Sequence, residues 1–332
     1  MASLPVVSFS AAADTVSRGA YLANAAGCED CHTDREHGGQ PYAGGRALAT
    51  PFGTFYSPNI TPDPETGIGR WSDKEFLRAL RDGVRPDGAN YFPVFPYPSF
   101  TNITDADAQA IKAYLFSLPA VRQANRAHDV SFPFSWRFLQ TIWKLLFFSA
   151  GPFRPVPDRS EAYNRGAYLV TALAHCGECH TPRNWFGATE PDRFLAGNPH
   201  GPDGKPVPNI TPDPQTGIGD WTEEDIATLL KTGQTPEFDF VGGAMGEVVR
   251  NTSRLDDADR RAIAVYLKSV PAIPSQKSSA FSPPISILRR SDRSAPIGAI
   301  GTSPEMNSRG SASACSEPQC ASCSARITLR AG

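Results

Sequence analysis

Five residues near the start of the chain, Cys28-Glu29-Asp30-Cys31-His32, combine residue types and a spacing that can do chemistry. Two cysteines separated by two residues can bond to the vinyl groups of a haem, and the adjacent histidine can bind its iron. The same spacing returns at Cys176-Gly177-Glu178-Cys179-His180. We therefore expect two covalently bound haem c groups, attached through Cys28, Cys31, Cys176 and Cys179, with His32 and His180 as axial iron ligands.

A second axial ligand can be proposed for the haem at His180. Histidine paired with methionine gives an electron-transfer haem a raised potential. The chain has three methionines, Met1, Met245 and Met306, and only Met245 lies where a distal loop would cross a haem face. Methionine more often fills a core, but position and scarcity favour Met245 as an iron ligand.

The corresponding loop of the first motif, residues 90–99, contains no methionine. Alignment from Gly83 and Gly233 pairs Phe95 with Met245, whereas alignment from the final helix pairs Pro93 with it. Neither residue can bind iron, so we expect His32 to face a weak or vacant sixth site. The other side chains that could reach this iron are His37, Asn90, Tyr91, Tyr97 and His128.

Both motifs belong to an internal repeat. Arg-Gly-Ala-Tyr-Leu stands at 18–22 and 165–169, and Asn-Ile-Thr-Pro-Asp-Pro stands at 59–64 and 209–214. Tyr-Leu followed by Ser and Pro closes each unit, at 114–119 and 266–271. The chain thus contains two copies of one domain, at 14–121 and 161–273, which we call the first and second repeats.

The repeats indicate an all-α fold. A first helix carries Arg-Gly-Ala-Tyr-Leu, and a second follows Trp71 or Trp221, with Ser72 or Thr222 as its N-cap. The last helix begins near residue 104 or 256 and ends before a proline. The alternation typical of strands is missing. The prolines and glycines after Asn59 and Asn209 indicate irregular loops there, which either turn the chain or hydrogen-bond haem propionates.

The linker between the repeats, residues 122–160, contains the most apolar stretch of the chain, residues 132–148. Arg137, Gln140 and Lys144 interrupt it, and it is too short to span a bilayer. It is interpreted as a linker helix packed between the two domains. The alternative is a helix that lies on a membrane or a partner subunit, anchored by Trp136 and Trp143.

The two ends differ in character from the repeats. Residues 1–13 resemble the end of a signal peptide, or else a disordered N-terminus. Residues 274–332 are serine-rich and predicted to be disordered, and Cys315, Cys320 and Cys323 match only part of an iron–sulfur spacing. A net charge of −2 gives no indication of nucleic-acid binding. Covalent haem attachment favours a periplasmic location.

The motifs resemble those of the multihaem cytochrome c subunits of bacterial periplasmic alcohol and gluconate dehydrogenases. The resemblance covers 14–273 and rests on R-G-x-Y-L before C-x-x-C-H-T, on N-I-T-P-D-x-x-T-G-I-G-x-W, and on Y-L-x-S-x-P. It implies two tandem cytochrome c-like domains that take electrons from a catalytic subunit and pass them to quinone or another cytochrome, in the periplasm or peripherally on the inner membrane. Members often carry three haem units, each with a distal methionine, whereas this chain has two units and one such methionine.

Electron transfer by a dihaem protein without catalytic activity of its own is the leading interpretation. An alternative is a dihaem enzyme, a peroxidase or a small-molecule oxidase, acting at an open first haem. A third interpretation makes the Cys-x-x-Cys pairs zinc ligands or redox dithiols. The placement of histidine directly after each second cysteine disfavours it.

Overall fold

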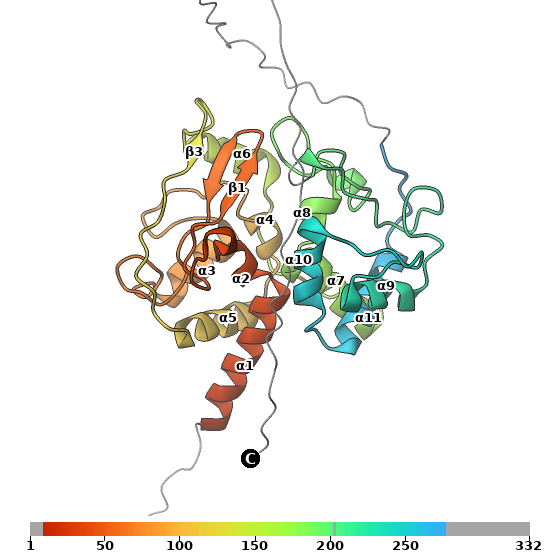
Figure 1. Ribbon diagram of the computed structural model, residues 1–332, viewed down its shortest axis with the longest axis horizontal. Helices are drawn as coiled ribbons and strands as arrows, with labels where there is room; N and C mark the ends of the chain where they lie inside the picture. Colours follow the sequence, from red (N-terminus) through yellow and green to blue (C-terminus); the bar gives the residue numbers. More distant parts are fainter. Residues whose placement is uncertain (1–8, 202–203, 277–332) are drawn as a thin grey trace, which may run out of the picture. The chain divides into compact units, whose positions relative to one another are not determined.

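Each repeat folds as a group of helices in which the first helix crosses the last, as the computed structural model in Figure 1 shows. The structure describes residues 9–201 and 204–276. The first repeat contains α1 (Phe9–Ala25), α2 (Cys28–Cys31), the 3₁₀ turn η1 (Arg35–His37), α3 (Asp73–Asp82), α4 (Tyr97–Phe100) and α5 (Asp105–Ser117). The second contains α7 (Glu161–Tyr168), the π-helical turn η2 (Leu169–Leu173), α8 (Gly177–His180), the 3₁₀ turn η3 (Pro191–Arg193), α9 (Glu223–Thr232), α10 (Gly243–Thr252) and α11 (Asp257–Ser269).

Some predictions fall on parts of the chain that are not described. Residues 1–8 and 277–332, with Met306 and the three cysteines of the C-terminal segment, lie outside the described residues. Residues 9–13, which were grouped with the signal-like segment, form the start of α1.

The predicted helix starts are confirmed. Ser72 caps α3, accepting from the backbone N–H of Glu75, whose carboxylate accepts from the Ser72 backbone in return. Thr222 and Asp225 form the same capping box at α9. These reciprocal bonds satisfy N–H groups that have no partner within the helix. Thr104 caps α5, and α5 ends at Ser117, just before the predicted proline stop.

A glycine allows the first and last helices of each repeat to touch. A Cβ atom on Gly19 of α1 would lie 1.9 Å from the Ala110 carbonyl oxygen of α5. A Cβ on Gly166 of α7 would lie 1.9 Å from the Ala262 carbonyl oxygen of α11. Only glycine fits between backbones this close. The glycine of R-G-x-Y-L therefore fixes the helix crossing in both repeats.

The all-α prediction is incomplete, because the fold also contains a small antiparallel sheet. β1 (Ala47–Thr50) pairs with β2 (Gly53–Tyr56), which pairs with β3 (Asp129–Val130) in the linker. The Thr50 hydroxyl accepts from Phe52 N–H and donates to the Gly53 carbonyl, closing a two-residue turn. These strands were missed because they are only two to four residues long, too short to show a clear alternation.

The linker helix α6 (Leu139–Phe147) is shorter than the apolar stretch of 132–148. Lys144 Nζ donates to the Gly83 carbonyl at 3.0 Å and to Asn90 Oδ1 at 2.8 Å, which fastens one side of α6 to the distal loop of the first repeat. Trp143 Nε1 donates to the Phe186 carbonyl of the second repeat at 2.9 Å. Among the described residues, no helix has the length and apolarity needed to cross a membrane.

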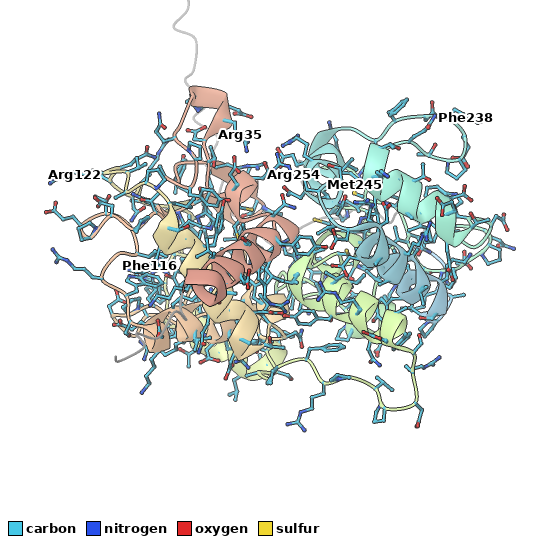
Figure 2. The ribbon with its side chains drawn as sticks, turned by 90° about the horizontal axis from the view of Figure 1, so that it is seen from below. Arg35, Phe116, Arg122, Phe238, Met245 and Arg254 are labelled. Carbon is cyan, nitrogen blue, oxygen red and sulfur yellow. The ribbon has the colours of Figure 1, made fainter. Side chains whose placement is uncertain are left out.

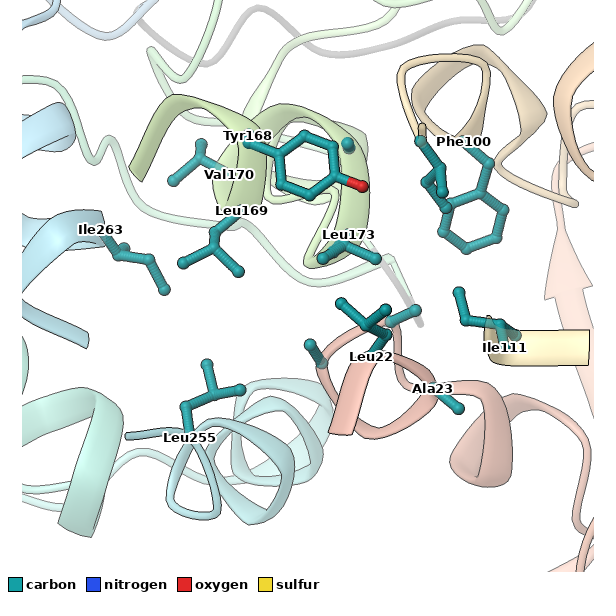
Figure 3. Packing of buried hydrophobic residues seen from close by; sticks show 14 of the residues in the cluster. Leu22, Ala23, Phe100, Ile111, Tyr168, Leu169, Val170, Leu173, Leu255 and Ile263 are labelled. Carbon is teal, nitrogen blue, oxygen red and sulfur yellow. The ribbon is translucent and has the colours of Figure 1, made fainter. Parts of the chain in front are cut away.

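Buried side chains of both repeats form one hydrophobic cluster. Figure 3 shows Leu22 of α1 among Leu173, Leu255 and Ile111, so that α1 contributes to packing with its own repeat and with the other. Leu22 is 1% exposed and Leu173 is fully buried. Burial of this apolar surface stabilises the association of the two repeats without fixing a direction.

Candidate haem-binding site

The cysteines of each motif lie on a single helical turn. Cys28–Cys31 forms α2, and the His32 backbone N–H donates to the Cys28 carbonyl at 3.0 Å. The His180 N–H makes the equivalent 3.0 Å bond to Cys176. The residue before each first cysteine is left-handed, with φ of 63° at Gly27 and 39° at His175. The two turns therefore start from the same backbone conformation.

Both motif histidines are held with one ring nitrogen available. His32 Nδ1 lies 2.7 Å from the Pro58 carbonyl oxygen, and His180 Nδ1 lies 2.8 Å from that of Pro208. A carbonyl only accepts, so Nδ1 carries the proton and the lone pair is on Nε2. Burial lowers the pKa of both rings, which favours the neutral form. A neutral imidazole oriented by a carbonyl through its other nitrogen is the usual metal-ligating arrangement.

The protein residues therefore fit a covalently attached haem. Each turn offers two thiols one helical turn apart and an imidazole whose Nδ1 is satisfied inside the protein. Within residues 9–201 and 204–276, no three His, Cys, Asp or Glu side chains are grouped so that they could hold a bare metal ion.

Met245 lies in the first turn of α10, half-buried against the hydrophobic cluster. Figure 2 shows it toward the middle of the view, whereas Phe238, seven residues earlier, lies at the edge of the molecule. Phe238 is 80% exposed. The distal segment of the second repeat thus turns inward at the first turn of α10, where Met245 lies.

Backbone hydrogen bonds show that the alignment from Gly83 and Gly233 also holds for the segment that contains Phe95. Tyr91 N–H donates to the Gly83 carbonyl, and Val241 N–H donates to the Gly233 carbonyl. Four residues beyond these donors stand Phe95 and Met245, and both pack against the hydrophobic cluster. Phe95, rather than Pro93, is therefore the structural counterpart of Met245.

Comparison with known proteins identifies the family. The model of the cytochrome c family matches residues 16–119. A dihaem cytochrome c-type protein of Cereibacter sphaeroides is 47% identical over 262 residues, covering 77% of this chain and 86% of that protein. The chain belongs to the cytochrome c family.

Two further relatives are, by name, cytochrome subunits of dehydrogenases. The cytochrome c subunit of a quinone alcohol dehydrogenase from Gluconacetobacter polyoxogenes is 42% identical over 301 residues, which cover 86% of this chain and 63% of that protein. The cytochrome subunit of a fructose dehydrogenase from Gluconobacter japonicus is 42% identical over 260 residues, which cover 78% of this chain and 53% of that protein. This cytochrome thus spans less than two thirds of either relative.

Family membership establishes the general role of the chain. A cytochrome c carries covalently bound haem c and transfers electrons. The relatives include the cytochrome c subunits of an alcohol dehydrogenase and of a gluconate dehydrogenase. The chain is therefore an electron-transfer component rather than a catalytic subunit. The zinc and enzyme interpretations gain no support.

Most of the other candidate ligands of the first haem are held elsewhere in the cytochrome. His37 is exposed and bonds to Asp34 at 2.9 Å. The Asn90 amide donates to the Thr141 hydroxyl at 2.9 Å and accepts from Lys144. His128 Nδ1 accepts from the Tyr56 backbone N–H at 3.2 Å. Two candidates remain. The ring of Tyr91 packs on that of Phe95, with the ring centroids 5.3 Å apart. The buried hydroxyl of Tyr97 has no hydrogen-bond partner within the protein.

The Asn and Thr side chains of the Asn-Ile-Thr-Pro-Asp loops hydrogen-bond within the protein and hold the loops in shape, so they are not free donors for haem propionates. Asn59 Oδ1 accepts from both the N–H and the hydroxyl of Thr61, and its amide donates to the Val121 carbonyl at 2.7 Å. Asn209 makes the same bonds to Thr211 and to the Ile273 carbonyl. These buried polar groups are satisfied within the protein, as buried groups must be.

Sequence reasoning missed the residues that position each motif histidine. Pro58 and Pro208 supply the orienting carbonyls. Thr33 and Thr181, directly after the histidines, accept from the backbone N–H of Tyr42 and of Leu195 at 3.1 and 3.0 Å. The available signal was the repetition of Pro-Asn-Ile-Thr and of Thr after each histidine.

Proposed function

We propose that this cytochrome carries two haem c groups and relays electrons from a periplasmic dehydrogenase to a respiratory acceptor, a quinone or another cytochrome. The observation that carries the proposal is the duplication of the whole attachment turn, including the carbonyl that orients each histidine. Each bound haem would supply a one-electron Fe(III)/Fe(II) couple. The name of the dihaem relative, of which the chain covers 86%, supports two groups.

The haems are held by Cys28, Cys31 and His32 in the first repeat and by Cys176, Cys179 and His180 in the second. Met245 completes the ligand set of the second haem. Phe95 occupies the equivalent position in the first repeat, so that haem has a weak or vacant sixth site. Phe95 packs against the rings of Tyr91 and Phe100 at 5.3 and 5.8 Å, which supports an apolar distal side.

The donor is a dehydrogenase catalytic subunit, by analogy with relatives named as cytochrome subunits of alcohol, fructose and gluconate dehydrogenases. One face of the linker helix supports a peripheral contact with the membrane. Phe138, Ile142, Leu145 and Leu146 follow a helical spacing and are all more than half exposed. A one-sided apolar face of this kind suits a helix lying in a membrane interface.

Haem content tests the number of groups. Haem staining of a denaturing gel, together with haem quantification, is expected to give two haems per chain. Cys28→Ser with Cys31→Ser should leave one, and so should Cys176→Ser with Cys179→Ser. One haem in the unmodified protein would contradict the dihaem assignment.

Spectra test the difference between the two sites. The reduced protein should bind carbon monoxide at one of its two haems, and the oxidised protein should show one sulfur-to-iron charge-transfer band. Two such bands, or no carbon monoxide binding, would show that the first haem has a strong sixth ligand after all.

Co-purification tests the partner. Extracted from its native membrane fraction, the cytochrome should elute with a dehydrogenase subunit and be reduced when the substrate of that subunit is added. A cytochrome that elutes alone and stays oxidised would contradict the subunit role.

Leu145→Ser with Leu146→Ser should weaken binding to anionic vesicles, whereas Thr15→Ser, outside the linker, should not.

A further inference from the structure

The R-G-x-Y-L run of each repeat has a role that attachment of its own haem does not explain. The Arg18 guanidinium donates to Asp107 Oδ1 of α5, with its Nε at 2.9 Å. Arg165 donates to both carboxylate oxygens of Asp259 in α11, at 2.8 and 2.6 Å. The arginine therefore joins the first and last helices within one repeat, beside the glycine that lets them touch.

The tyrosine of the same run crosses to the other repeat. Tyr21 donates to Asp259 Oδ2 at 2.6 Å, and its hydroxyl accepts from the Asp256 backbone N–H at 3.1 Å. Tyr168 donates to Asp107 Oδ2 at 2.7 Å and accepts from the Thr104 backbone N–H at 3.3 Å. Each aspartate thus receives the arginine of its own repeat and the tyrosine of the other.

These contacts are reciprocal. Tyr21 and Tyr168 hold the same position in R-G-x-Y-L, and Asp107 and Asp259 hold the same position in the last helix. Equivalent residues exchange roles as they do across the two-fold axis of a symmetric dimer. We call Tyr21, Asp259, Tyr168 and Asp107 the cross-repeat lock.

A second pair of contacts joins the haem-attachment turns to the opposite repeat. Asp30, inside the first C-x-x-C-H run, accepts from the Asn251 amide of α10 at 2.9 Å. Glu178, at the same position of the second run, accepts from the Ser99 hydroxyl of α4 at 2.7 Å. Ser99 and Asn251 each stand five residues before the N-cap of the last helix. This second pair of contacts therefore joins each attachment turn to the other repeat.

Apolar packing alone would leave the two repeats free to slide, because it has no preferred direction. Directional bonds to buried carboxylates remove that freedom, since a shifted interface would leave Asp107 and Asp259 with unmet hydrogen bonds. Asp107 is 3% exposed and Asp259 is 8% exposed, so water cannot readily replace the tyrosine hydroxyls.

We propose that Tyr21 and Tyr168 are positioning residues whose cross-repeat bonds fix the distance and orientation between the two haems, and so set the rate of electron transfer between them. The inference rests on the proposed presence of two haems. In this proposal, R-G-x-Y-L holds the two cytochrome c repeats in the arrangement that allows electrons to pass between their haems.

The test uses the full-length protein loaded with both haems. Tyr21→Phe and Tyr168→Phe, alone and combined, remove only the hydroxyls of the lock. Tyr114→Phe is the matched control, because the Tyr114 hydroxyl bonds to that of Tyr42 within the first repeat, at 3.2 Å. Ser99→Ala with Asn251→Ala removes the second pair of contacts and leaves both tyrosines in place.

Circular dichroism in the Soret region reports the relative orientation of two neighbouring haems through their exciton couplet. Photoreduction followed by transient absorption reports inter-haem electron transfer. The double tyrosine variant should lose most of the couplet and transfer electrons several-fold more slowly, with each single variant in between. The Ser99/Asn251 double variant should change both readouts in the same direction but less, and Tyr114→Phe should match the unmodified protein.

Two kinds of failure can be told apart. If the unmodified chain contains a single haem, the proposed dihaem function is wrong and the lock loses its purpose. If two haems are present and the double tyrosine variant keeps the couplet and the transfer rate, the positioning role is overturned. A uniform fall in thermal stability with an unchanged couplet would equally overturn it, because it would show a structural role only.

Discussion

The two repeats share an attachment turn but differ in the segment that would cover the opposite haem face. His32 and His180 are each oriented by the carbonyl of the proline before Asn-Ile-Thr. By contrast, the helix that carries Met245 in the second repeat has ten residues, whereas α4 in the first has four and follows Phe95. The two repeats therefore keep the same turn around the C-x-x-C-H run although their distal segments differ.

Differences in length are absorbed locally. Between Leu169 and Cys176 the second repeat has one residue more than the first has between Leu22 and Cys28. The π-helical turn η2 (Leu169–Leu173) lies in this interval, and α1 contains no such turn. A π turn takes up a single inserted residue while the helix continues. The insertion therefore leaves the attachment turn in register.

The largest effect should come from exchanging the two distal residues. Met245→Phe should abolish the sulfur-to-iron band and lower the potential of the second haem by on the order of 0.1 V, because axial ligands tune haem potentials over about 0.8 V. Phe95→Met should add a second band and suppress carbon monoxide binding. Met306→Leu, outside both repeats, is the control for spectra and redox titration. A band that persists in Met245→Phe would exclude Met245 as the ligand.

Next in size is the effect of filling the helix crossings. Gly19→Ala and Gly166→Ala should each lower the free energy of unfolding by about 1–3 kcal/mol or more, since the new methyl group meets a carbonyl oxygen in a packed crossing. The two losses should be similar, because the geometry is the same. Gly242→Ala, with nothing within 4 Å of the new atom, should change little in denaturant titrations. A harmless substitution in one repeat would show that its crossing can open.

A comparable effect is expected from acid on the Asp259 carboxylate of the lock. Burial by itself raises the pKa of Asp259, but hydrogen bonds from Arg165 and Tyr21 and nearby arginine charges outweigh it, so the pKa lies below its ordinary value. A carboxyl with a lowered folded-state pKa stabilises the fold above its unfolded pKa of about 3.9 and loses this contribution as the pH falls through the folded value.

Asp259→Asn should therefore destabilise the protein by about 1.5–3 kcal/mol at neutral pH, because hydrogen bonds to a charged group are lost. The free energy of unfolding of this variant should also fall less steeply with decreasing pH than that of the unmodified protein. Thermal unfolding across the acid range measures both, with the exposed Asp220→Asn as control. An unchanged acid slope would show that other carboxyls dominate.

The smallest effect concerns the capping boxes. Ser72→Ala and Thr222→Ala should each cost about 1 kcal/mol, since each removes the acceptor for an N–H group at the start of α3 or α9. Denaturant unfolding should give equal losses for the two repeats. Clearly unequal losses would mean that the two helices contribute differently to the cooperative unit.

Much of the local structure could be read from particular residues. Ser72 and Thr222 are the N-caps of α3 and α9, and Thr104 is the N-cap of α5, so these helices begin where the sequence predicted. The three short strands escaped notice because two to four residues are too few to show an alternation, and β3 comes from the linker to pair with β2. The sequence also left open whether Pro93 or Phe95 matches Met245, since two registers fitted equally well until the backbone hydrogen bonds of Tyr91 and Val241 were seen.

The sequence by itself determined the attachment motifs, the duplication and the absence of a methionine from the first repeat, because these depend only on residue types and spacing. The tertiary structure decided which groups meet across the repeats. Tyr21 and Asp259 are 238 residues apart in the chain yet 2.6 Å apart in space. No local periodicity encodes that contact, since it arises only when two folded repeats pack face to face. The same holds for the carbonyl that orients each motif histidine, which a long loop brings back to the ring.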